Sequence, residues 1–130
     1  MTRDRLGRWV MAASLMSLPF MLPHVVEDFA EGIALRVGLS TGAGAFQLGG
    51  YLALQSLGLV LLGRGQRAGF IVTFWVGLVW VLGALVDHGP ELLAGRFRTG
   101  PASVLWVVGL LVAQARSSSL AWRGFRSQEV

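Results

Sequence analysis

The sequence AGFIVTFWVGLVWVLGALV, residues 68–86, decides the fold class of this chain. It carries no charged side chain from end to end. About 20 apolar residues in a helix are enough to cross the ~30 Å hydrocarbon core of a bilayer. The run is continuously apolar rather than alternating, so it favours a transmembrane helix over a barrel strand.

Three further stretches of the same kind lie on either side of it. They cover residues 9–26, 42–62 and 101–115, and the last can extend through Ser117 to Trp122. Short connections place consecutive helices antiparallel. We therefore predict an all-α, four-span transmembrane helix bundle, with residues 1–130 forming a single integral membrane domain.

The composition agrees with this prediction. Hydrophobic residues make up 54% of the 130 residues and charged residues only 14%. A soluble domain has about a quarter of its residues charged, so a soluble globular enzyme is excluded. The apolar content also excludes disorder. Because the chain has no Cys, disulfides, thiolate zinc sites and cysteine nucleophiles are excluded as well.

The first span begins like a signal peptide, with three Arg before an apolar core. No small-x-small cleavage site follows it, since the chain continues MLPHVVED. We therefore interpret it as an uncleaved anchor.

The distribution of arginine predicts the orientation of the bundle. Eight of the 11 basic residues fall on the side of the two termini and of the connection between the second and third spans. Because basic residues are enriched in cytoplasmic loops, we predict an inner or plasma membrane protein with both termini in the cytoplasm. The same bias explains the basic charge without nucleic-acid binding. The eight are Arg3, Arg5, Arg8, Arg64, Arg67, Arg116, Arg123 and Arg126.

Association of helices in lipid depends on small residues and on polar contacts between helices. Ala45, Gly49 and Ala53 recur at four-residue spacing in the second span and predict a packing ridge, and Gly50, Leu54 and Gly58 form a second one. The amides Gln47, Gln55 and Gln114 are expected to find partners in the interior.

The two connections that are predicted to lie outside the membrane resemble each other in sequence. A His-x-x-Glu sequence ends the first span at residues 24–27 and the third span at residues 88–91. A Thr-Gly pair then precedes the second and the fourth spans. The pattern is typical of a tandem duplication of helical hairpins, with repeats 1–64 and 65–130. Chance similarity between two apolar hairpins is the competing interpretation.

The repeated motif supplies the candidate functional residues His24, Glu27, His88 and Glu91. His and Glu three residues apart share one helix face, so the two faces are expected to converge between the first and third spans. Asp28 and Asp87 flank them. We expect the two imidazoles to lie about 4 to 6 Å apart between nitrogens, close enough to share one ion.

Three kinds of chemistry suit this set. Two imidazoles and several carboxylates can bind a divalent metal such as Zn, Fe or Mn, with all four residues as ligands. His24 and His88 could instead be axial ligands of haem. Without any cofactor, Glu27 and Glu91 could act as catalytic general bases on a lipophilic small molecule.

A purely structural interpretation stands beside these. All these residues fall near span ends, where polar side chains are expected. In this interpretation Pro90 is a first helical residue, Asp87 ends its helix, and Pro23 bends the end of the first span.

The sequence HVVED, His24 to Asp28, resembles the bacterial membrane proteins named for a His-x-x-Glu-Glu motif at the end of an early span. The last Glu of that motif is Asp in this chain. The resemblance covers five residues and implies a small multi-helix membrane protein, with no activity established for the family.

The sequence therefore predicts a multi-pass membrane protein with an outward-facing His/Glu site that binds a metal or performs acid–base chemistry. One alternative is a non-catalytic accessory or scaffold subunit of a larger membrane complex. Another is a small transporter working as a homo-oligomer, which the lack of an ionisable residue at mid-membrane disfavours.

Overall fold

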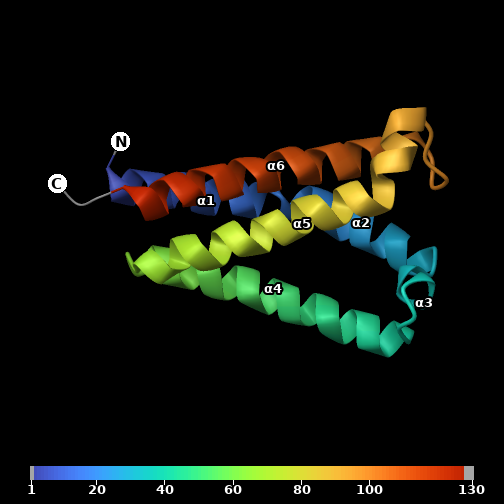
Figure 1. Ribbon diagram of the computed structural model, residues 1–130, viewed down its shortest axis with the longest axis horizontal. Coiled ribbons are helices and arrows are strands. Elements are labelled where there is room, and N and C mark those ends of the chain that lie inside the picture. Colours follow the sequence, from blue (N-terminus) through green and yellow to red (C-terminus); the bar gives the residue numbers. More distant parts are fainter. Residues whose placement is uncertain (1, 128–130) are drawn as a thin grey trace.

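The computed structural model describes residues 2–127, and this part of the chain is helical without any strand. The predicted all-α fold class is confirmed (Figure 1). The helices are α1 Arg3–Met16, α2 Leu18–Ala30, α3 Ile33–Arg36, α4 Thr41–Gly63, α5 Arg67–Ala94 and α6 Pro101–Arg126.

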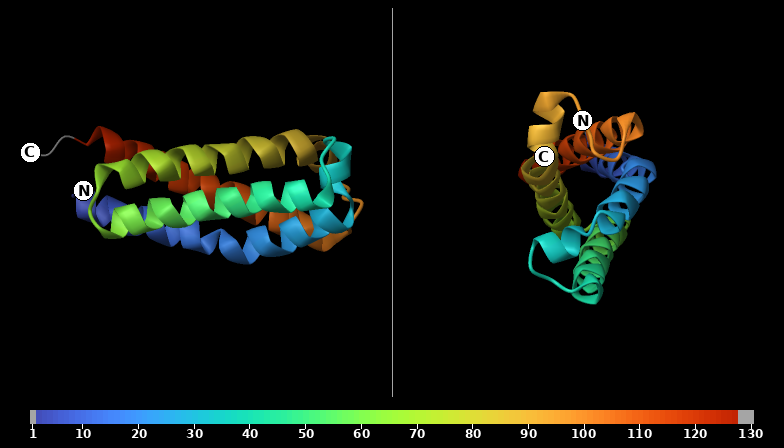
Figure 2. Two further views of the ribbon diagram at one scale, coloured as in Figure 1. Left: turned by 90° about the horizontal axis from the view of Figure 1, so that it is seen from below. Right: turned by 90° about the vertical axis from the view of Figure 1, so that its right-hand side faces the viewer.

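Four helical segments are long and apolar enough to cross a membrane. The first is Arg3–Ala30, which combines α1 and α2, and the others are α4, α5 and α6. They run up and down, so both described ends of the chain and the turn between α4 and α5 lie at one end (Figure 1, Figure 2). The short helix α3 and the connection between α5 and α6 lie at the other end, which we call the α3 end.

The third and fourth spans extend beyond the predicted boundaries. Helix α5 continues through Asp87 to Ala94 and contains Pro90 in its interior. The interpretation of Pro90 as a first helical residue, and of Asp87 as the end of a helix, was therefore wrong. At about 1.5 Å per residue this helix is longer than the ~30 Å hydrocarbon core. A helix of this length cannot lie wholly within the hydrocarbon core.

The first span is interrupted near its middle. Helix α1 ends at Met16 and α2 begins at Leu18, with Pro19 in its first turn. The Ser17 hydroxyl donates to the Ser14 carbonyl at 2.6 Å, so it partners a backbone oxygen at the break. The interruption thus lies before Pro23, the residue at which the sequence predicted a bend, and Pro23 is inside α2.

The break adjoins a layer of buried polar side chains inside the bundle. Gln55 Nε2 donates to Ser14 Oγ at 3.0 Å, and Gln114 Nε2 donates to Ser17 Oγ at 2.9 Å. These bonds join α4 and α6 to the first span and confirm the prediction for two of the three amides. The prediction for Gln47 was wrong, because this residue is exposed.

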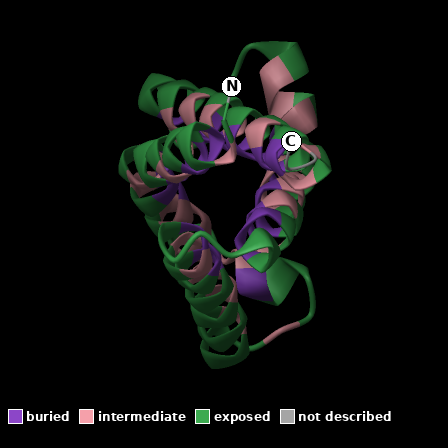
Figure 3. Cartoon of the chain, turned by 90° about the vertical axis from the view of Figure 1, so that its left-hand side faces the viewer, coloured by how far each residue is buried: buried purple, intermediate pink, exposed green. Residues whose placement is uncertain are grey.

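The first predicted packing ridge of α4 is exposed. This holds for Ala45, Gly49 and Ala53, and a Cβ at Gly49 would meet nothing within 4 Å. Helix α4 instead approaches α5 at Gly58, a member of the second predicted ridge, which lies against Thr73, and at Leu62, which lies against Gly69. Buried residues line the inward faces of the helices in the end-on view (Figure 3).

Candidate metal centre

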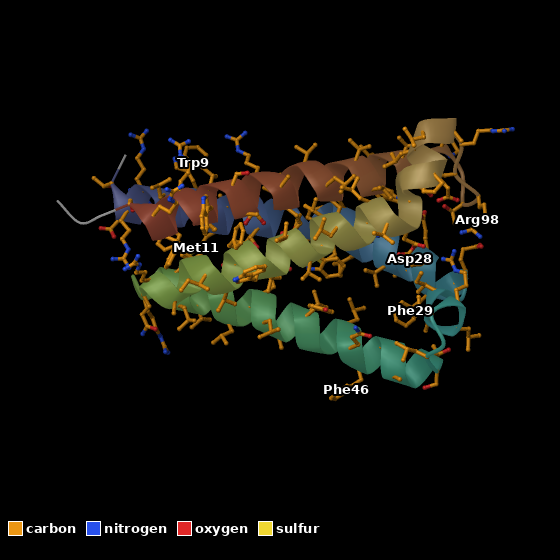
Figure 4. The ribbon with its side chains drawn as sticks, in the orientation of Figure 1. Trp9, Met11, Asp28, Phe29, Phe46 and Arg98 are labelled. Atoms are coloured by element: carbon orange, nitrogen blue, oxygen red, sulfur yellow. The ribbon has the colours of Figure 1, made fainter. Side chains whose placement is uncertain are left out.

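The two histidines lie at the α3 end of the bundle, on α2 and α5. Each is six residues from the last residue of its helix, and both are buried, with exposed fractions of 5% for His24 and 7% for His88. Asp28 follows His24 by one helical turn and therefore shares its helix face. Figure 4 shows Asp28 and Arg98 at this same end.

The structure brings the two imidazoles together across the bundle. Their ring centroids are 4.9 Å apart and their planes are 68° from parallel. His24 Nε2 lies 3.3 Å from Asp28 Oδ2, and His88 Nε2 lies 3.3 Å from Asp28 Oδ1. One ligand atom from each of the three residues lies within 4.8 Å of the others. The ligand nitrogens of the two imidazoles are therefore no more than 4.8 Å apart, which is below the upper limit of about 6 Å expected from the sequence.

Nitrogen Nε2 of His88 has no hydrogen-bond partner in the described part of the chain, although it is buried. Two carboxylate oxygens are close to it, Asp28 Oδ1 at 3.3 Å and Asp87 Oδ2 at 3.2 Å, but neither contact has hydrogen-bond geometry. A buried polar atom without a partner is costly. This nitrogen therefore faces two carboxylate oxygens at ion-pair distance, an arrangement in which a proton or a bound cation could be shared.

The other nitrogen of His88 is held by Glu91. Nδ1 of His88 lies 2.9 Å from Glu91 Oε2, within hydrogen-bond distance. Arg98 Nε donates in turn to the second oxygen of Glu91 at 3.1 Å. When Nδ1 carries the proton, Nε2 presents its lone pair to the cluster. This carboxylate–histidine arrangement is the one that orients metal-binding histidines in proteins.

Glu27 lies apart from this cluster. Ser103 Oγ, at the start of α6, donates to its Oε2 at 2.7 Å, and Ser103 is also within hydrogen-bond distance of Thr99. Glu27 therefore links α2 to the first turn of α6, while Asp28, its neighbour, faces the two imidazoles.

The charges around the histidines favour a cation. Asp28, Asp87 and Glu91 surround His88, and Arg36 approaches Asp87 at 3.9 Å. With Arg98 on Glu91, two guanidinium groups face three carboxylates. The side chains around the imidazoles therefore carry a net negative charge, which favours a bound cation.

Asp28 is the functional candidate to which the sequence interpretation gave only a flanking position. The signal was present, because His24 and Asp28 are four residues apart and residues at that spacing share a helix face. The repeated His-x-x-Glu motif drew attention to Glu27 and Glu91 instead. In the structure the two glutamates make different contacts, one with Ser103 and the other with His88.

No family model matches the chain, and we found no match among curated proteins or solved structures.

Proposed function

We propose that this membrane protein binds a divalent transition-metal ion, Zn, Fe or Mn, through His24, Asp28 and His88. The observation that carries the proposal is the buried Nε2 of His88, which lacks a hydrogen-bond partner while two carboxylate oxygens lie within 3.3 Å. Two ligands held at about 2.1 Å from a tetrahedral ion are roughly 3.4 Å apart. The 3.3 Å contacts of both imidazoles with Asp28 fit this spacing.

The donor set favours an ion with accessible coordination positions. Two imidazoles and one carboxylate are the ligands found at catalytic metal sites, where a water or a substrate completes the coordination. Asp87 lies beside the cluster and can accept a proton or serve as a further ligand. Glu91 keeps the His88 ring in place and fixes which nitrogen carries the proton.

The arginine distribution supports an outer position for this site. The predicted cytoplasmic Arg residues lie in the half of the bundle away from this site, toward the described ends of the chain. In this orientation the site can exchange its ion with the exterior, close to the boundary between lipid and water.

The experiment is metal analysis of the protein purified in a mild detergent. We expect about one equivalent of metal after loading and removal of free ions. Co²⁺ as the probe should give the visible absorption of a low-coordinate site with nitrogen and oxygen ligands. His24→Ala, His88→Ala and Asp28→Asn should each abolish stoichiometric binding. The matched control is Glu31→Gln, an exposed carboxylate one turn beyond Asp28.

Wild-type protein that stays metal-free, with no effect of Zn²⁺, Fe²⁺ or Mn²⁺ on its melting temperature, would overturn the proposal. The accessory-subunit alternative would then gain support if the protein co-purified with one fixed partner and His24→Ala left that complex intact.

A further inference from the structure

The largest of the cavities described in the structure adjoins the His/Asp cluster. Its volume is about 600 Å³, within the range of cavities that bind small organic molecules. It extends from His24, Asp28 and Asp87 along α5 toward Val79 and is bounded by α3 and α4. In Figure 1, α4 and α5 diverge from their shared turn toward the α3 end, where this cavity lies.

The wall of the cavity is mainly apolar and is open along α5. Val79, Leu82 and Val86 line the cavity and are also exposed. Because α5 is one of the four spans, its exposed apolar side chains face lipid. A molecule dissolved in the membrane can therefore enter the cavity from the side, without passing through water.

The end of the cavity beside the histidines is acidic. Asp28 and Asp87 line it, and their side chains keep exposed fractions of 18% and 27%. Arg36 and Arg98 offset part of the negative charge of the cluster, but neither of them lines the cavity. Carboxylates without guanidinium groups on the same wall attract a cationic ligand and repel an anionic one.

Asp87 has one carboxylate oxygen that a ligand can reach. Its Oδ2 is buried and lies 3.2 Å from His88 Nε2 and 3.9 Å from a guanidinium nitrogen of Arg36. The other oxygen, Oδ1, is accessible and is used by neither contact. A cation in the cavity can therefore approach Asp87 without displacing Arg36 or His88.

The residues that line α5 also set the length of the ligand. Trp80, Gly83 and Asp87 lie at helical spacing and share one face of α5. The rise of a helix separates the levels of Trp80 and Asp87 by about 10 Å. Tyr51 completes the end away from Asp87, with its ring centroid 6.4 Å from that of Trp80. This aromatic end can hold the apolar part of a ligand.

We propose that this cavity binds a lipophilic ammonium ion, with its charge beside Asp87 and an apolar body of about 10 Å extending toward Trp80 and Tyr51. The proposal does not depend on a bound metal. An ammonium ion and a divalent metal would offset the same negative charge, so we expect the ligand on the metal-free protein.

The test is equilibrium dialysis of the full-length protein, purified in a mild detergent and treated with a chelator. Protein-free micelles serve as the blank. The probes are octyltrimethylammonium and the neutral hydrocarbon of the same shape, in which carbon replaces the nitrogen. The wild type should bind about one equivalent of the cation, and should bind the hydrocarbon about tenfold more weakly.

Variants of Asp87 test the position of the charge. Asp87→Asn should lower affinity for the cation about tenfold and leave affinity for the hydrocarbon unchanged. Asp87→Glu keeps the charge and should keep most of the affinity. The matched control is Glu31→Gln, which removes an exposed carboxylate at the same end of the bundle and should change neither probe.

Gly83 tests the position of the apolar body. A Cβ at Gly83 would meet nothing within 4 Å, so Gly83→Leu can fill the cavity and should lower the binding of both probes. Gly49→Leu is its control, because it places the same side chain on the exposed face of α4. Unchanged binding in Gly83→Leu would overturn the assignment to this cavity.

Metal uptake, measured in separate samples, distinguishes the two proposals. If the protein takes up metal but binds the two probes equally, or if Asp87→Asn binds the cation like the wild type, the ammonium proposal alone is overturned. Cation binding that depends on Asp87 and Gly83, in a protein that never takes up metal, supports the ammonium proposal and overturns the metal function.

Discussion

At the scale of single residues, His88 is the centre of the site because its two ring nitrogens have different surroundings. Nδ1 contacts Glu91, while Nε2 lies between two aspartates without a hydrogen-bond partner in the described chain. A carboxylate on the far side of a ligating imidazole raises its basicity and fixes its orientation. Glu91 should therefore act through His88 rather than by contacting the ion.

Glu91→Gln is expected to weaken metal affinity about 10–100-fold without abolishing binding, the range found for such outer partners. Competition with a chelator of known affinity measures the change. Glu27→Gln is the matched control, since Glu27 contacts Ser103 and should leave the affinity unchanged. An equal loss in both variants would show that general negative charge, rather than the Glu91–His88 contact, controls affinity.

At the scale of helices, the bundle depends on a few close approaches and on polar contacts between spans. A Cβ at Gly69 would lie 2.5 Å from the backbone nitrogen of Leu62, so α4 and α5 can pair at their shared turn only with glycine there. The open space at Gly49 shows that small size alone does not identify a contact. Which face of α4 is packed depends on where the neighbouring helices lie.

Gly69→Ala is expected to lower the free energy of unfolding by about 1–3 kcal/mol, because the clash is with backbone that cannot move away. Gly49→Ala should leave it unchanged or slightly raised. Unfolding in mixed micelles with increasing SDS measures both. The packing assignment fails if Gly49→Ala is the more destabilising of the two.

Gln114→Leu removes the hydrogen bond to Ser17 at the break of the first span. Such bonds in membranes contribute about 0.6 kcal/mol, so a loss of that order or somewhat more is expected because Ser17 is fully buried. Gln47→Leu, on the exposed face of α4, should cost nothing. The same SDS titration compares the two variants, and equal stabilities would contradict the interior contact.

At the scale of the whole molecule, the arginine distribution and the up-and-down order of the helices indicate the same orientation of the bundle. Both described ends and the turn between α4 and α5 lie together, and seven of the 11 basic residues lie at that end, while Arg116 lies inside α6. The candidate metal centre lies at the opposite end. Orientation in the membrane therefore determines which compartment could supply the proposed ion.

Single cysteines test this orientation cleanly, because the chain has none of its own. In intact cells or right-side-out vesicles, a membrane-impermeant maleimide should label Arg96→Cys, which is exposed beside the metal centre. Gln66→Cys, exposed at the turn between α4 and α5, should be labelled only after permeabilisation. The reverse pattern would place the site in the cytoplasm.

The sequence by itself determined that four apolar helices span a membrane, because hydrocarbon leaves the backbone few alternatives to helix. It also indicated that His24 and His88 lie near the same end, since the length of each span fixes depth along the helix. Depth does not specify which side chains face each other across the bundle. That depends on how each helix is rotated and on where α1 and α2 break, so only the tertiary structure placed Asp28 rather than Glu27 between the imidazoles and opened a cavity beside them.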